Sequence, residues 1–183
     1  MELIVLAGGE GSRLGGQDKA ALVLGGRTLL DRVLDAVDPG ARVIVVGPRR
    51  ETARPVVWTR EDPPGGGPVA GLAAGLARVS ADVVAVLAVD QPGITAATLT
   101  RLRAALTEDV DGVVLVDAEG RPQWMVGVWR TGALRRCLPG SPSGSSLRRV
   151  LGALTVRRLP AENAEADDID TPEDLGRWRE RAE

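Results

Sequence analysis

The N-terminal part of the chain holds a stretch whose residue types could bind phosphate. After the apolar run at 3–6, a loop contains five glycines within nine residues, Gly8, Gly9, Gly11, Gly15 and Gly16. Glycines let backbone N–H groups approach a ligand closely, and they tolerate φ of either sign. Arg13 and Lys19 add side-chain positive charge to these donors. The combination predicts a loop that binds a polyphosphate.

This loop differs from the common phosphate-binding loops. A Walker loop needs Ser or Thr after its lysine, but Lys19 is followed by Ala20. A dinucleotide fingerprint needs a third glycine where Leu14 stands, and an acid near the end of the second strand, where the chain has Gly47 and Pro48. Lys19 is nevertheless the only lysine among 23 Lys and Arg residues, and its compact ammonium suits a phosphate. We therefore expect a nucleotide loop of another kind.

Carboxylates form the second group of candidate residues. Asp90 follows seven consecutive apolar residues at 83–89, which predict a buried and central strand. Asp168 and Asp170 flank Ile169, so an extended backbone would place both carboxylates on one face. Carboxylate oxygens are ligands that Mg²⁺ prefers. The alternative for Asp90 and for Asp170 is a helix cap.

Composition narrows the chemistry. The chain has 183 residues, 44% of them hydrophobic and 26% charged, as in one ordinary globular domain. The absence of histidine excludes a Ser-His-Asp triad and an imidazole metal site, and the single Cys137 is expected to be packing filler. A net charge of −2 and the lack of Phe and Tyr argue against nucleic-acid binding. Without a long apolar run or a basic leader, we expect no membrane partner and a cytoplasmic location.

Apolar and turn patterns predict strands alternating with helices. Strands are expected at 3–6, 42–46, 56–59, 83–89, 112–116, 124–129 and 155–159, and helices at 29–37, from 68, 95–106, 131–138, 147–151 and from 172. The strand at 124–129 is the one expected to run antiparallel. Helix starts are marked by Thr28 with Asp31, and by Thr95 and Ser146. This alternation predicts a single α/β domain over 1–183 with a mostly parallel sheet, whose ligands lie beyond the carboxyl ends of the strands.

Four motifs resemble those of one enzyme family. The run L-A-G-G-x-G-S-R-L-G-G-x-D-K, which starts at Leu6, resembles the signature loop of sugar-nucleotide-type nucleotidyltransferases. Its G-G-x-D-K ending is most similar to molybdenum cofactor guanylyltransferases. The motifs G-G-P-V-A-G-L from Gly66, A-V-D-Q-P from Ala88 and D-I-D-T-P-E-D-L from Asp168 follow in the family's order. One glycine loop alone would be a weak signal, whereas four motifs in order are a strong one.

The resemblance implies a Rossmann-like three-layer domain of the nucleotide-diphospho-sugar transferase type. It also implies Mg²⁺-dependent transfer of GMP from GTP to the phosphate of molybdopterin, with release of pyrophosphate. The nucleotide would be bound by Leu6, Ala7, Gly8, Gly9, Gly11, Ser12, Arg13, Lys19, Asp62, Gly67, Pro68 and Gly71. The catalytic residues would be Arg13, Lys19 and Asp90, and the metal ligands Asp90 and Asp170. Asp62 would face the edge of the guanine.

Several alternatives stay open. Guanylyltransferases of this family commonly carry Asn where Asp170 stands, so the resemblance leaves open both metal ligation and acceptor contacts by this residue. The chain lacks the Arg-x-x-Ser-Val pattern of the isoprenoid cytidylyltransferases, yet CMP transfer to the same cofactor, another phosphorylated acceptor or a non-catalytic nucleotide-binding domain remain alternatives. Arg148 and Arg149 either hold an anionic acceptor or line a solvated helix face. A cofactor-delivery protein is a further partner that the resemblance suggests.

Overall fold

Seven strands form one mixed sheet in the order β5-β4-β1-β6-β8-β7-β9. A computed structural model describes residues 1–8 and 14–182. The strands are β1 (Glu2–Leu6), β4 (Val43–Val46), β5 (Val57–Thr59), β6 (Val83–Ala88), β7 (Gly112–Val116), β8 (Pro122–Arg130) and β9 (Val156–Pro160). Only β8 runs antiparallel to its neighbours β6 and β7. The prediction of a mostly parallel sheet with one antiparallel strand is therefore confirmed.

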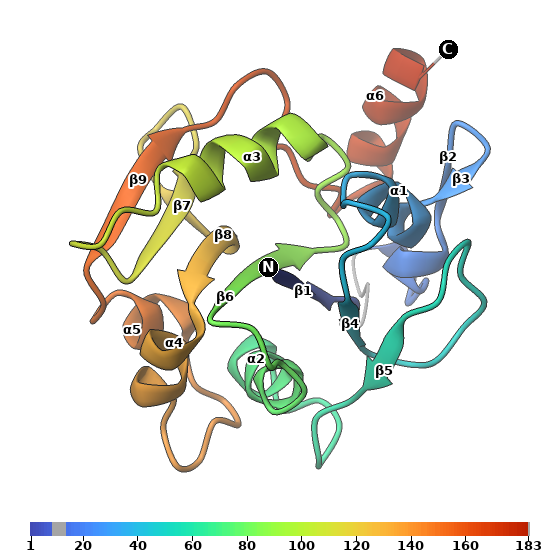
Figure 1. The fold of residues 1–183 in the computed structure, drawn as a ribbon. Helices are drawn as coiled ribbons and strands as arrows, with labels where there is room; N and C mark the ends of the chain where they lie inside the picture. The colour runs from blue at the N-terminus through green and yellow to red at the C-terminus, as the bar shows by residue number, and fades with distance from the viewer. Residues whose placement is uncertain (9–13, 183) are drawn as a thin grey trace.

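Helices cover both faces of this sheet. They are α1 (Leu29–Asp35), α2 (Pro68–Leu76), α3 (Ala96–Ala104), α4 (Thr131–Cys137), α5 (Leu147–Leu151) and α6 (Pro172–Ala182). Figure 1 shows α1, α3 and α6 above the sheet and α2, α4 and α5 below it, and each set packs on its own hydrophobic cluster. The predicted α/β fold with three layers is confirmed.

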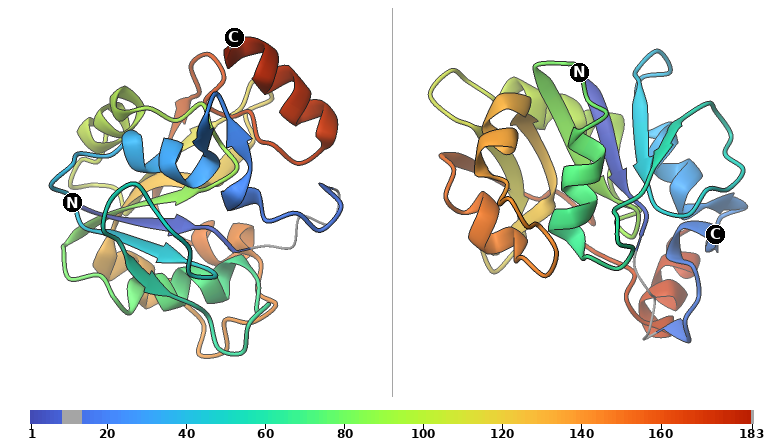
Figure 2. Two further views of the ribbon diagram at one scale, coloured as in Figure 1. Left: turned by 90° about the vertical axis from the view of Figure 1, so that its right-hand side faces the viewer. Right: turned by 90° about the horizontal axis from the view of Figure 1, so that it is seen from below.

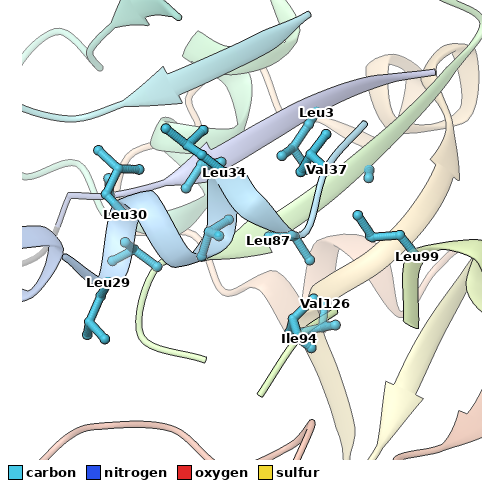
Figure 3. Close-up of a cluster of buried hydrophobic side chains, with 14 of the residues drawn as sticks. Leu3, Leu29, Leu30, Leu34, Val37, Leu87, Ile94, Leu99 and Val126 are labelled. Carbon is cyan, nitrogen blue, oxygen red and sulfur yellow. The ribbon is translucent and has the colours of Figure 1, made fainter. Parts of the chain in front are cut away.

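The inner strand β1 is apolar from Leu3 to Leu6 because both of its faces are covered. In β1, Leu3 and Val5 join the cluster under α1 and α3, whereas Ile4 and Leu6 join the cluster under α2. All four residues are buried. Figure 3 shows Leu3 beside side chains of α1 in the first cluster. Burial on both faces explains why this strand shows no alternation of apolar and polar residues.

Small residues let α2 lie close to the sheet. A Cβ atom on Gly75 would stand 2.8 Å from Cγ2 of Ile4, and one on Gly71 would stand 3.5 Å from Cδ2 of Leu6. A larger side chain at Gly75 would therefore push the helix away. The close contact fixes the N-terminus of α2 at the edge of the sheet where β1 ends.

A short hairpin between the glycine loop and α1 was not predicted. The structure forms a 3₁₀ turn η2 (Lys19–Ala21) and the antiparallel pair β2 (Val23–Leu24) and β3 (Arg27–Thr28). Gly25 and Gly26 have φ of 58° and 74°, which a two-residue hairpin turn requires. Two strands of two residues are too short to show a periodic pattern. Figures 1 and 2 show α6 packed next to this hairpin.

Most of the expected helix caps are present. Thr28 Oγ1 accepts a hydrogen bond from Asp31 N at 3.0 Å, and Thr95 forms a capping box with Thr98. Ser146 does occupy the position before α5, but its side chain makes no capping hydrogen bond, so that expectation is wrong. The observed ends of the longer helices and strands lie within about two residues of the expected ones, as is usual for boundaries inferred from sequence.

The start of α6 corrects one assignment. Asp170 was considered as the residue that caps this helix, but the helix begins at Pro172 and Thr171 caps it. Thr171 Oγ1 accepts a hydrogen bond from Asp174 N at 3.2 Å, and Asp174 Oδ2 accepts one from Thr171 N at 2.8 Å. These reciprocal hydrogen bonds between Thr171 and Asp174 form a capping box, which takes the role considered for Asp170. The carboxylate of Asp170 is therefore directed elsewhere.

In the described ranges, no helix is long and apolar enough to cross a membrane.

A buried carboxylate ties together the edge of the sheet at which β1 begins. Glu2 accepts hydrogen bonds from Arg42 Nη1 at 2.9 Å, from Ser80 N at 2.7 Å and from Ala81 N at 3.2 Å. Burial alone would raise the pKa of Glu2, but these donors outweigh burial and lower the pKa to about 2. Glu2 therefore stabilises the fold as a carboxylate.

Glu2→Gln should lower the free energy of unfolding at pH 7 by about 2–3 kcal/mol, since the pKa is depressed relative to the unfolded chain. A group with a depressed pKa contributes its full stability above its unfolded pKa. The difference between wild type and variant should therefore shrink as the pH falls from 4.5 towards 2. Urea unfolding of both proteins at several pH values measures this difference. A difference that stays constant over that range would contradict the assigned role.

Candidate functional site

Three segments distant in sequence meet at the edge of the sheet where the parallel strands end. The first is the segment that follows β1, the second follows β6, and the third leads into α6. Val89 N donates to Leu6 O at 3.2 Å, which continues the pairing of β1 and β6 beyond their ends. Ile169 N donates to Asp90 O at 2.9 Å and so attaches the third segment to the second. Side chains from all three segments can therefore meet.

Lys19 lies between two carboxylates at this meeting point. Its Nζ donates to Asp90 Oδ2 at 2.8 Å and also to Asp170 Oδ1. The side chains of Lys19 and Asp90 are only 17% and 18% exposed. Burial alone would lower the pKa of Lys19, but the contacts with Asp170 and Asp90 outweigh it and raise the pKa. Lys19 is thus a fixed cation at neutral pH, and the structure brings these three predicted site residues together.

Asp168 adds a third carboxylate to this group. Its neighbour Ile169 is fully buried, so the alternation predicted around Ile169 is present. Although much of Asp168 is exposed, burial of its carboxyl group and the negative charges of Asp170 and Asp90 raise its pKa, while Lys19 acts in the opposite direction. Three carboxylates facing one ammonium leave a local excess of negative charge. Such an excess favours a cation.

The donor set fits Mg²⁺. Asp90 Oδ2 and Asp170 Oδ1 contact the same ammonium, so both oxygens are directed at one point. Mg²⁺ is usually held by one or two carboxylates, with waters and substrate phosphates as its other ligands. Within the described ranges, no group of three or more acidic, His or Cys residues is arranged to hold a metal ion by itself. A magnesium ion bound beside these carboxylates would therefore take its other ligands from water and from substrate phosphates.

The segment that carries Lys19 is fixed by its neighbours. Asp18 Oδ1 accepts a hydrogen bond from Ala20 N at 3.2 Å, which caps η2. The other carboxylate oxygen of Asp18 pairs with Nη1 of Arg50, whose side chain is only 15% exposed. Arg50 comes from the segment after β4, the neighbour of β1 in the sheet. Sequence reasoning missed Arg50. Its only signal was an arginine a few residues after a buried strand.

The residues expected to bind the nucleotide occupy the same edge as far as the structure describes them. Leu6 and Ala7 are buried at the end of β1, and Gly67 and Pro68 form the start of α2. Gly71 lies in the first turns of that helix, beside Leu6. Asp62 is exposed in the loop between β5 and α2. Gly8 follows Ala7 and is exposed, whereas the predicted residues Gly9, Gly11, Ser12 and Arg13 lie outside the described residues.

Two further candidates have simple surroundings. Arg148 and Arg149 are exposed on α5, as expected of a solvated helix face. Cys137 ends α4 and is half-buried, and its thiol donates to Leu134 O at 3.2 Å. Burial raises the pKa of the Cys137 thiol, which keeps it neutral. A neutral, half-buried thiol is a packing residue.

A cavity of about 630 Å³ adjoins the carboxylate cluster. It is lined by the turn between β7 and β8, by the segment before Asp168 and by α6. Asp168 belongs to both the cavity and the cluster, so the two are adjacent. The lining also includes Trp178 and the guanidinium groups of Arg177 and Arg181. A ligand in this cavity would lie next to Asp168.

Comparison with known proteins supports a single family. The family described as MobA-like NTP transferase domain matches residues 3–159. A protein of Cereibacter sphaeroides named molybdenum cofactor guanylyltransferase is 31% identical over 188 residues, which cover 95% of this chain and 93% of that protein. A protein of the same name from Bradyrhizobium sp. is 34% identical over 158 residues, covering 80% of this chain and 74% of that protein.

Solved structures share the fold. The molybdopterin-guanine dinucleotide biosynthesis protein A of Archaeoglobus fulgidus has a TM-score of 0.77 at 23% identity, over 99% of this chain and 98% of that one. The 2-C-methyl-D-erythritol 4-phosphate cytidylyltransferase of Thermus thermophilus has a TM-score of 0.73 at 22% identity, over 100% and 99% of the two chains. The family match over residues 3–159 and the relative that is 31% identical show that the chain belongs to the MobA-like NTP transferase family and is a nucleotidyltransferase.

Proposed function

We propose that this protein transfers GMP from GTP to the phosphate of a molybdopterin-type acceptor, releases pyrophosphate and uses Mg²⁺. The observation that carries the proposal is the contact of Lys19 Nζ with both Asp90 and Asp170. This contact supports the proposal because it gathers one ammonium and two carboxylates in one place, and carboxylate oxygens suit Mg²⁺. Relatives that bear the name molybdenum cofactor guanylyltransferase support the choice of nucleotide and acceptor.

The reaction needs no general base, because the acceptor phosphate is already ionised. One of its oxygens attacks the α-phosphorus of GTP, and the bond from that phosphorus to the oxygen bridging to the β-phosphorus breaks. The electron pair leaves with pyrophosphate. Catalysis then depends on alignment and on the stabilisation of charge. The lack of histidine in the chain is compatible with such a mechanism.

The residues of the cluster have distinct tasks in this proposal. Asp90 and Asp170 would hold a metal ion, which would neutralise charge on the phosphates. Lys19 has three N–H donors, of which two are directed at these carboxylates, and it stabilises charge on the departing pyrophosphate. Asp18 and Arg50 keep the Lys19 segment in place. The cavity beside Asp168 has room for the acceptor.

The choice of base depends on Asp62 in this proposal. Guanine offers a ring N–H and an amino group side by side, and one carboxylate can accept both. Cytosine has an acceptor where guanine has the ring N–H, so a carboxylate would repel it. Asp62 is exposed in the loop that leads to α2, which leaves its carboxylate accessible to a base. Transfer of CMP to the same acceptor is the alternative, which direct competition between GTP and CTP tests.

Asp90→Asn should abolish most turnover and leave the fold intact, because the amide removes the negative charge that holds the metal. Pyrophosphate release at saturating Mg·GTP with acceptor measures this loss. Asp109→Asn is the matched control. Asp109 is an exposed acid between α3 and β7, so this change should leave turnover unaffected. A near-normal rate in the Asp90 variant would refute its role as a metal ligand.

Lys19→Ala should reduce kcat about 10²-fold or more, which corresponds to roughly 2–4 kcal/mol for a preorganised donor to the transition state. Lys19→Arg should restore only part of the rate, because a guanidinium cannot replace a compact ammonium between two carboxylates. Steady-state kinetics with varied GTP separate kcat from KM. A change confined to KM would mean that Lys19 binds substrate and transition state equally.

In direct competition, GTP should exceed CTP by roughly 10³-fold in kcat/KM, since a polar group left unpaired costs several kcal/mol. Asp62→Ala should reduce this ratio, mainly by lowering kcat/KM for GTP. Glu61→Ala is the control, because the Glu61 carboxylate accepts a hydrogen bond from Gly65 N at 3.1 Å and should not affect the base. Equal use of both nucleotides by the wild type would show that the protein is not a guanylyltransferase.

A further inference from the structure

The segment that carries Asp168 and Asp170 has no regular structure of its own. Residues 161–170, which we call the acidic strap, link β9 to α6 and form neither helix nor strand. Backbone hydrogen bonds attach the strap near both ends, from Ala161 N to Val116 O at 2.8 Å and from Ile169 N to Asp90 O at 2.9 Å. Between these two points the strap makes two backbone turns, with hydrogen bonds from Glu165 N to Glu162 O and from Asp167 N to Ala164 O, both at 3.2 Å. Side chains and packing attach these turns to the rest of the molecule.

The middle of the strap lies directly on the backbone after Asp90. A Cβ atom on Gly93 would stand 2.1 Å from Ala164 O, so only glycine allows this approach. The strap therefore contacts the turn between β6 and α3 over several residues. A shift of the strap would change the position of Asp170 relative to Asp90.

Glu165 fixes the strap to α3 from the buried side. Only 7% of this residue is exposed. Its Oε1 accepts a hydrogen bond from Thr98 Oγ1 at 2.6 Å, and its Oε2 accepts from Arg101 Nη2 and, at 2.8 Å, from Glu162 N. Arg101 Nη1 also donates to Pro160 O at 2.9 Å. One carboxylate thus connects the start and middle of the strap to two successive turns of α3.

The charge of Glu165 is part of this anchor. Burial alone would raise its pKa, but the backbone of Glu162 and the side chains of Thr98 and Arg101 outweigh burial and lower the pKa. The group is therefore ionised at neutral pH and holds Arg101 as a charge-assisted partner. An amide at this position would lose that attraction and would also have to accept hydrogen bonds with only one oxygen.

We propose that Glu165 is a positioning residue, which sets the place of Asp170 relative to Asp90 and Lys19 and thereby the affinity of the site for a divalent cation. The inference rests on the proposed function only in placing that cation at Asp90 and Asp170. Glu165 lies five residues before Asp170 in the chain and acts through the strap. The expected effect is that of groups that orient metal ligands, which change metal affinity about 10–100-fold.

A second buried glutamate provides a matched control. Glu2 also accepts hydrogen bonds from one arginine and from backbone N–H groups, but it lies at the opposite edge of the sheet. Replacing either glutamate with glutamine should destabilise the protein, because each change weakens a buried hydrogen-bond network. Only the change at Glu165 should alter the cation site. The comparison separates positioning from general loss of stability.

The test uses Mn²⁺ alone as the probe, with binding to the full chain followed by electron paramagnetic resonance. Glu165→Gln should weaken Mn²⁺ binding about 10-fold or more, and Glu2→Gln should leave it unchanged, while urea unfolding shows that both variants are destabilised. Arg101→Lys should also weaken Mn²⁺ binding and destabilise the protein, each to a smaller extent. This variant replaces Glu165→Gln in the test if Glu165→Gln does not fold. The apparent half-saturation of turnover by Mg²⁺ should rise in parallel.

A double-mutant cycle decides whether Glu165 acts through Asp170. In an Asp170→Asn background, Glu165→Gln should have no further effect on Mn²⁺ affinity, while its effect on stability should persist. Unchanged Mn²⁺ affinity in Glu165→Gln, or an equal loss in Glu2→Gln, would overturn the inference. So would independent, additive effects of the Glu165 and Asp170 changes. Failure of GMP transfer with this Mn²⁺ pattern intact would refute the proposed function and not the positioning.

Discussion

The interaction on which the site depends is the contact of one ammonium with two carboxylates. The three residues come from separate segments of the chain. Asp90 lies 71 residues after Lys19, and Asp170 lies 151 residues after it. Because Lys19 and Asp90 are largely buried, each charge needs the other to offset its loss of hydration. Without the ammonium, the carboxylates would repel one another. The same arrangement that pairs these charges is the one that we propose binds a metal ion and a phosphate.

The sheet makes this contact possible. Strands β1 and β6 are parallel neighbours with Leu6 opposite Ala88, so the residues that follow them leave at the same edge. Strand β8 runs antiparallel between β6 and β7, which makes β7 parallel to β6 again, and β9 is parallel to β7. The end of β9 therefore also reaches that edge. The strap that begins there can attach to α3 and bring Asp170 to Asp90.

A buried glutamate paired with an arginine occurs at each of the two edges of the sheet, with a different proposed role at each. Glu2 joins Arg42 and the turn at Ser80 where β1 begins, and it contributes to stability. Glu165 joins Arg101 to the strap where the strands end, beside the carboxylate cluster. Both are buried carboxylates that are kept ionised by an arginine and backbone donors. Their difference in proposed function comes from position alone.

The sequence by itself determined the strands of the seven-stranded sheet, the helices α1 to α6 and the candidates Lys19 and Asp90. Burial patterns, glycine clusters and cap residues could do so because they act over a few neighbouring positions. Only the tertiary structure showed that Asp170 faces Lys19 while Thr171 caps α6, and it alone revealed the hairpin after η2. It alone also identified Glu165 as an anchor. The hydrogen-bond partners of Glu165 on α3 lie more than sixty residues away. Local sequence preference cannot specify such a partner, because it depends on which distant segments the folded sheet brings within about 3 Å.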